Sequence, residues 1–196
     1  MVKGVRFIPE EKIEQKAIAV LEKAEKQKIY QFKSHTPVDL IAEKIFKLHI
    51  RFTNLNQDLE GVLGALDINN KIIWIDDSLN GDNKNFTLNA RCNFTIAHEF
   101  GHYAFHKKLY NEENIQLYHY GDNQNKAIKN METQADLFAS HILMPTAVLM
   151  KKLSSISQYQ PFNQTLFELT RFFKVSKEAM VIRLKKLGLV DEDYQL

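Results

Sequence analysis

Several features that would place a protein in a particular class are scarce or missing in this sequence. The chain of 196 residues has a single cysteine, Cys92, so it can form neither an internal disulfide bond nor a cysteine-based zinc site. Its net charge is only +2, which gives no reason by itself to expect a nucleic-acid or membrane partner. No apolar run approaches the roughly 18 residues of a membrane-spanning helix, because His141 and Pro145 interrupt the most apolar stretch, "LFASHILMPTAVLM".

The N-terminal residues "MVKGVRFIPEEKIEQKA" also lack the apolar segment of a secretory signal peptide. We therefore expect a cytoplasmic protein, and the single cysteine is in keeping with a reducing compartment. With 44% hydrophobic and 26% charged residues, the composition is ordinary for a soluble globular protein. The length suits one domain, or one core with a small appendage.

The sequence does contain clear helical and strand periodicity. Several segments carry apolar residues every three or four positions, which is typical of amphipathic helices. Two short apolar segments flank the pair Asn69-Asn70, which is typical of a β-hairpin. We expect helices at about residues 9–27, 37–48, 88–107, 131–145, 164–173 and 177–187, strands at 49–55, 61–68 and 71–79, and polar loops at 80–85 and 111–130.

This order of elements predicts an α+β fold, with helices packed on one side of a small, mostly antiparallel three-stranded sheet. Pro145 should end or restart the helix that precedes it. No linker separates two independent domains. We expect a core over residues 1–153 and a C-terminal helical extension over residues 154–196 that packs on this core.

The stretch "FTIAHEFGHYAFH", residues 94–106, has three histidines at intervals of four. On a helix, His98 and His102 lie one turn apart on one face, close enough to share a tetrahedral metal ion. Glu99 can take the proton of a water held by that ion. The pattern arises by accident in roughly one chain in a hundred or fewer of this length. Apolar neighbours predict a buried helix, in which two histidines without a partner would be costly.

A catalytic zinc site also needs a third protein ligand and an open position. The downstream candidates are His106, His119, Glu132 and His141. His106 is two turns from His98, about 12 Å along the helix axis, so a structural role, a substrate contact or a contact behind the ligands suits it better than ligation. His119 lies in a polar loop and is a weaker candidate.

Glu132 is better placed, because Asp136 follows it by one turn on the same face of an apolar helix. Glu132 could bind the metal, and Asp136 could accept a hydrogen bond from the outer ring nitrogen of a ligand histidine. The competing interpretation is a glutamate favoured by the helix N-terminus and a solvated aspartate. Beside His-Glu-x-x-His we favour the ligand interpretation, and small Ala135 and Ala139 would allow close approach of the two helices.

At this point the sequence resembles the ImmA/IrrE metallopeptidases. The stretches that carry the resemblance are "PVDLIAEKIFKLHIRF", "GVLGALDINNKIIWID", "NFTIAHEFGHYAFH", "ETQADLFASHILMP" and "FFKVSKEAMVIRLKKLGLV". They occur in the family's order and cover most of the chain after Thr36. The Glu-x-x-x-Asp spacing is also similar to the third-ligand segment of thermolysin-type gluzincins. One departure is His141, where the family suggests an apolar residue before Leu-Met-Pro.

The resemblance implies zinc bound by His98, His102 and Glu132, with Glu99 as general base and a zincin-like active-site helix. Manganese or cobalt would also suit this donor set. The resemblance to this family further implies a cytosolic protease that cleaves a helix-turn-helix repressor encoded nearby, in a phage, mobile-element or stress response. The family has an arginine at the position of Arg183, which could contact substrate or the active site, or lie at an ordinary interface.

Other side chains could donate to the oxyanion formed on the scissile carbonyl, although ordinary packing or loop roles compete with this one. These are Tyr103, Tyr118, His119 and Tyr120.

Two alternatives to a peptidase come from the C-terminal residues and from the metal site itself. The segment "FELTRFFKVSKEAMVIRLKKLGLV" has the helix-turn-helix pattern of DNA-binding modules, and Lys177, Arg183, Lys185 and Lys186 could meet phosphate. The near-neutral charge and the acidic "VDEDYQ" that follows argue against direct nucleic-acid binding. A regulatory binder with a merely structural metal site would have no need of Glu99.

Overall fold

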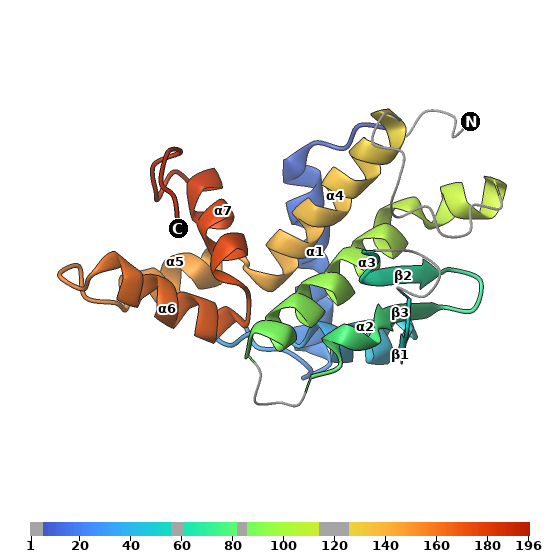
Figure 1. Cartoon of the computed structure of the whole chain (residues 1–196), viewed down its shortest axis with the longest axis horizontal. Helices are drawn as coiled ribbons and strands as arrows, with labels where there is room; N and C mark the ends of the chain where they lie inside the picture. Colours follow the sequence, from blue (N-terminus) through green and yellow to red (C-terminus); the bar gives the residue numbers. More distant parts are fainter. Residues whose placement is uncertain (1–5, 56–60, 82–85, 114–125) are drawn as a thin grey trace.

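The computed structural model describes residues 6–55, 61–81, 86–113 and 126–196 (Figure 1). Within these ranges the chain forms seven α-helices, one short 3₁₀ helix and one sheet. The elements in chain order are α1 (Glu10–Lys26), α2 (Val38–Phe46), β1 (His49–Thr53), β2 (Gly64–Asp67), β3 (Ile72–Asp76), η1 (Asp77–Leu79), α3 (Phe86–Glu113), α4 (Lys126–Leu143), α5 (Thr146–Ser154), α6 (Phe162–Phe173) and α7 (Lys177–Lys186).

The three strands form a mixed sheet in the order β1-β3-β2. The predicted hairpin is confirmed: β2 and β3 pair antiparallel, and Asp67 closes the turn by accepting hydrogen bonds from the backbone N–H and side-chain amide of Asn70. β1 pairs parallel with β3, so one of the two strand pairings is parallel. Local sequence patterns do not predict the parallel pairing, because it joins β1 to β3 across the intervening β2 segment of the chain.

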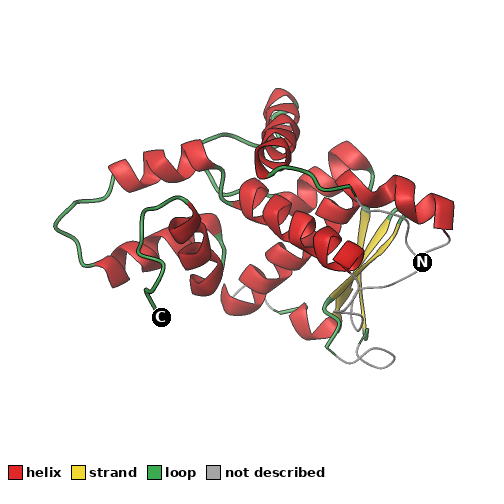
Figure 2. Cartoon of the chain, turned by 90° about the horizontal axis from the view of Figure 1, so that it is seen from above, coloured by secondary structure: helices red, strands yellow, loops and turns green. Residues whose placement is uncertain are grey.

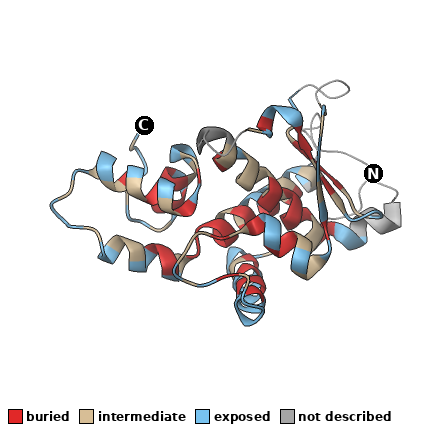
Figure 3. Cartoon of the chain, turned by 90° about the horizontal axis from the view of Figure 1, so that it is seen from below, coloured by how far each residue is buried: buried red, intermediate tan, exposed pale blue. Residues whose placement is uncertain are grey.

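The sheet lies at one end of the molecule, against the helices (Figure 2). Ile73 and Ile75 of β3 are fully buried in this interface, together with the buried Leu66 of β2, which lies opposite Ile73. α1 shows the predicted stripe, in which Ile13, Ala17, Val20, Leu21 and Ala24 are all buried. The expected α+β architecture is thereby confirmed, and the buried residues concentrate in the central helices (Figure 3).

The long helix α3 runs through the middle of the molecule and packs most closely against α4. A Cβ atom added to Gly101 would lie 3.0 Å from the Cα of Ala135, so only glycine fits this contact without a shift. The rings of Phe100 and Phe138 pack edge to face beside it, 5.4 Å apart. The small residues therefore hold the two helices that carry the candidate ligands close together.

The helices at either end of the predicted loop 111–130 are longer than expected. α3 continues to Glu113 and α4 begins at Lys126, while residues 114–125 lie outside the described residues. Their sequences explain the extension, because "NEE" and "KAIKNM" contain good helix formers and no glycine or proline. None of the described helices combines the length and the apolar character that crossing a bilayer requires.

After Pro145 the chain restarts as α5 and then forms the helix pair α6–α7. The predicted turn between α6 and α7 is present: Lys174 adopts a left-handed conformation, and the Ser176 hydroxyl caps α7 by accepting from the N–H of Ala179. Gly188, at φ +65°, follows the end of α7. These helices project to one side of the core and join it where α7 meets the ends of α4 and α1.

Candidate metal centre

Three side chains from α3 and α4 bring nitrogen and oxygen atoms to one place. His98 and His102 come from consecutive turns of α3, and Glu132 comes from the facing side of α4. The two Nε2 atoms are 3.0 Å apart, and the carboxylate oxygens of Glu132 lie 3.2 Å from Nε2 of His98 and 3.5 Å from Nε2 of His102. The three candidate donor atoms all lie within 4.8 Å of one another.

These separations fit a metal ion. Ligands at about 2.0–2.1 Å from a tetrahedral zinc ion lie about 3.4 Å from each other, close to the three distances above. The side chain of His102 is fully buried, whereas that of Glu132 is 32% exposed, so the group is closed on one side and open on the other. Two imidazoles and a carboxylate with an open side are the donor set of a catalytic rather than a structural site.

Asp136 lies behind His98 and orients its ring. Its Oδ1 is 2.9 Å from Nδ1 of His98, so this nitrogen donates to the carboxylate and Nε2 points toward Glu132. Burial lowers the pKa of His98, but hydrogen bonds to Asp136 and Glu132 and the charge of Glu99 outweigh burial and raise it to about 10. The carboxylates of Asp136, Glu132 and Glu99 thus favour a positive charge at the ring of His98. Asp136 thus lies behind a candidate ligand histidine.

His106 lies behind His102 in the corresponding position. Its Nδ1 is 3.0 Å from Nδ1 of His102, and its Nε2 is 3.1 Å from Oε1 of Gln134. His106 is 1% exposed. It therefore lies away from the open side and contacts His102 from behind, which is one of the alternatives given for it above. Gln134 gave no motif-like signal in the sequence and was missed.

Glu99 is 2% exposed and packs under the start of β2. A Cβ atom added to Gly64 would lie 3.0 Å from Oε1 of Glu99 and 2.5 Å from Cγ2 of Thr95, so the strand can approach α3 only with glycine at this position. An isolated glycine inside a strand pattern often marks such an approach. The sequence therefore carried a signal for Gly64, which we did not use.

The remaining candidate oxyanion donors are one residue of α3 and three residues outside the described ranges. Tyr103 is half-buried on α3, with Nζ of Lys107 5.2 Å above the centre of its ring. The candidate oxyanion donors that fall outside the described residues are Tyr118, His119 and Tyr120.

Arg183 and His141 form a second polar cluster, between α7 and the ends of α4 and α1. The Arg183 guanidinium is 1% exposed and donates to the Met144 carbonyl, to the Thr146 hydroxyl and to Nδ1 of His141. Nε2 of His141 is 3.1 Å from Oε1 of Glu10. Arg183 therefore makes an internal contact between α7 and the core, which is the interface alternative given above, and both ring nitrogens of His141 contact members of this cluster.

A largely apolar cavity of about 450 Å³ lies beside the candidate centre. Asp136 and Thr95 line it on the side of the candidate ligands, and α7 forms another wall with Ala179 and Ile182. The other apolar lining comes from Leu63, Ala90, Phe94, Leu137 and Met144. The cavity therefore lies between the core helices α3 and α4 and the C-terminal helix α7.

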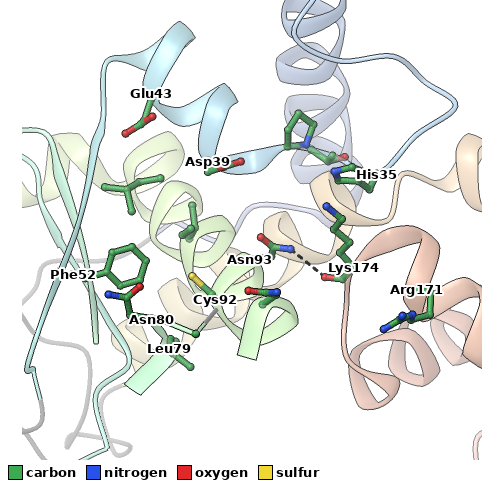
Figure 4. A pocket seen from close by; sticks show the side chains of 16 residues that line it. His35, Asp39, Glu43, Phe52, Leu79, Asn80, Cys92, Asn93, Arg171 and Lys174 are labelled. Atoms are coloured by element: carbon green, nitrogen blue, oxygen red, sulfur yellow. Dashed lines mark hydrogen bonds between the residues drawn. The ribbon is translucent and has the colours of Figure 1, made fainter. Parts of the chain in front are cut away.

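A larger cavity of about 1120 Å³ opens on a different face of α3 (Figure 4). Asp39 and Glu43 of α2 line one part of it, and Lys174 lies across from them. Asn93 of α3 donates to the Lys174 carbonyl over 3.3 Å. Burial, and then the charge of Asp39, raise the pKa of the Cys92 thiol in this wall to about 11, so it is not a reactive thiolate at neutral pH.

Comparison with known families shows which family the chain belongs to. The model of the M78 peptidases, described as the IrrE N-terminal-like domain, matches residues 43–185 and includes all three candidate ligands. The chain belongs to the M78 peptidase family. The predicted resemblance to ImmA/IrrE proteins is thereby confirmed. M78 membership implies a metal ion, and the matched range extends into α7.

No curated protein matches the chain. Among solved structures, a Mycobacterium tuberculosis transcriptional regulator is similar, with a TM-score of 0.54 and 11% identity over 95% of this M78 chain. The match covers 54% of the regulator, so this chain spans about half of its length. At this identity the likeness concerns the fold alone.

Proposed function

We propose that this M78 protein is a metal-dependent endopeptidase, with zinc as the preferred ion held by His98, His102 and Glu132. The observation that carries the proposal is the convergence of these donors on one partly open point, with the charge of Glu99 acting on His98. A metal ion bound there supplies Lewis acidity, which polarises a peptide carbonyl and lowers the pKa of water.

Glu99 acts as the general base in this proposal. It follows His98 directly on α3, and its carboxylate is enclosed by Gly64 and Thr95, which fixes where the oxygens can lie. A carboxylate held in this way accepts the proton of the attacking water and then delivers it to the leaving amine. Asp136 orients His98 throughout, because its hydrogen bond fixes the ring of that histidine.

The cavity beside Asp136 is the natural place for a side chain of the substrate. Its lining is mostly apolar, so it favours an apolar residue next to the cleaved bond. Because α7 forms one wall, the C-terminal helices contribute to the cleft as well as to the fold. This arrangement favours selective cleavage over broad digestion.

The proposed substrate is a helix-turn-helix repressor in the cytoplasm, encoded near this protein. The family resemblance supports the substrate class, and the partly enclosed cleft supports selectivity. A direct DNA-binding function loses one of its supporting residues, because Arg183 is buried and engaged inside the protein. A gel-shift assay in low and moderate salt would detect the DNA-binding alternative.

The first prediction is one equivalent of transition metal per chain in protein purified without chelator. Elemental analysis measures it. The His98→Ala, His102→Ala double variant should contain no metal, because it removes two of three ligands, whereas His49→Ala, which changes an exposed histidine on β1, should retain the full equivalent. Full metal content in the double variant would show that the ion is held elsewhere.

The second prediction concerns the substrate. Purified protein is incubated with the repressor from the neighbouring reading frame and, separately, with casein, and mass spectrometry maps the products. We expect a single cut in the repressor that a chelator abolishes, and little digestion of casein. Efficient digestion of casein with an intact repressor would reduce the proposal to a general metallopeptidase. A chelator-insensitive cut would contradict the metal mechanism itself.

A further inference from the structure

A chain of hydrogen bonds leads from the ring of His102 to the N-terminal segment. Nδ1 of His102 meets Nδ1 of His106, Nε2 of His106 meets Oε1 of Gln134, and Nε2 of Gln134 donates to the backbone carbonyl of Arg6 over 3.1 Å. His102, His106 and Gln134 are 0%, 1% and 3% exposed, so bulk water does not compete for the hydrogen bonds of these residues.

The far end of the chain sets its direction. The Arg6 carbonyl can only accept a hydrogen bond, so the Gln134 amide must present its NH₂ group to it. This turns Oε1 of Gln134 toward His106, and an amide oxygen also only accepts. Nε2 of His106 must therefore carry the hydrogen that it shares with Gln134.

The same reasoning continues through the ring of His106. In neutral imidazole only one nitrogen carries hydrogen, so Nδ1 of His106 is the acceptor. Nδ1 of His102 must then be the donor across the 3.0 Å contact. The lone pair of His102 is thereby placed on Nε2, which is the atom that faces His98 and Glu132.

We propose that His106 and Gln134 are positioning residues that fix His102 in the tautomer required of a metal ligand. The inference rests on the proposed metal site. It also distinguishes the two histidines, because His98 is oriented by a carboxylate and His102 by a neutral imidazole–amide pair. A carboxylate that accepts a hydrogen bond from a histidine raises the basicity of its metal-binding nitrogen more than a neutral partner does. The two candidate ligands therefore differ in basicity.

Two variants of His106 test the proposal through metal affinity. His106→Phe keeps a planar ring but removes the acceptor, which leaves the Nδ1–H of His102 buried without its partner. We expect its affinity for zinc, measured by competition with a chromophoric chelator, to fall about 10–100-fold. In His106→Asn the side-chain oxygen can replace Nδ1, and most of the affinity should return. His49→Phe makes the same change on the exposed face of β1 and should leave affinity unchanged.

Nitrogen NMR of the histidine rings gives a readout that a merely structural role would not move. In wild-type protein without metal, His102 should carry hydrogen on Nδ1 and His106 on Nε2, and Gln134→Met should disturb the His106 tautomer. Hydrogen on Nε2 of His102, or wild-type affinity in folded His106→Phe, would overturn the inference. The expected tautomers in a wild-type protein that binds no metal would support the hydrogen-bond assignment and contradict the proposed function instead.

Discussion

Glu99→Gln should fold and bind metal like the wild type, yet cleave substrate about 10²–10⁴-fold more slowly, the usual contribution of a general base. Glutamine has nearly the same volume, which matters because Glu99 is 2% exposed and Gly64 packs against its carboxylate. The change removes the ability to accept a proton and leaves His98, His102 and Glu132 in place. Single-turnover cleavage of the repressor is the appropriate measurement.

The matched control for this prediction is Glu22→Gln, which makes the same chemical change on the exposed face of α1. It should cleave at the wild-type rate. Metal content should be one equivalent in both variants, so that loss of rate cannot be attributed to loss of the ion. Comparable cleavage rates in wild type and Glu99→Gln, in clean preparations, would rule out Glu99 as the base.

The parts of the site that the sequence predicted are those that depend on spacing within one helix. His98 and His102 share a face of α3, and Glu132 and Asp136 share a face of α4, because residues four apart lie about one turn apart on a helix. The contact between these faces of α3 and α4 depends on the tertiary structure, which the spacing within one helix does not predict. The sequence indicated it only through the small residues Ala135 and Ala139, and the structure shows the backbone of Ala135 in close contact with Gly101.

The parts that the sequence did not predict depend on partners far along the chain. The parallel pairing joins β1 to β3, the second strand of the hairpin, across the intervening β2 segment of the chain. His106 was set aside as a third ligand on distance grounds, and one of its two hydrogen-bond partners, Gln134, is 28 residues away on another helix. Periodicity shows which face of a helix is buried and does not show which buried polar atom will meet which.

Arg183 shows the same limit most clearly. A basic residue in "VIRLKKL" looks like part of a charged surface, and the family pattern suggested the active site. In the fold it points inward, where the ends of α1 and α4 and the start of α5 supply acceptors. Glu14 lies 3.9 Å from its Nη2, and Glu14 also accepts a hydrogen bond from Thr146. The histidine that departs from the family pattern, His141, is one of its direct partners.

Arg183→Met should therefore destabilise the protein strongly without altering the chemistry of the folded fraction. Methionine fills much of the volume but leaves the Met144 carbonyl, the Thr146 hydroxyl and Nδ1 of His141 without their donor. Removing one partner from a buried ionic cluster costs about 3–5 kcal/mol, and we expect the lower end, about 3 kcal/mol, because the side chain of Glu14 is 33% exposed and can be solvated. Urea unfolding measures the change.

Lys177→Met, at the exposed start of the same helix, is the control and should change the free energy of unfolding by less than about 0.5 kcal/mol. The decisive comparison is between stability and activity. If Arg183 only joins α7 to the core, Arg183→Met protein that is folded at low temperature should bind metal and cleave at rates near wild type. A variant of wild-type stability that has lost cleavage would instead place Arg183 in contact with substrate, because a contact used only in the reaction affects the rate without affecting unfolding.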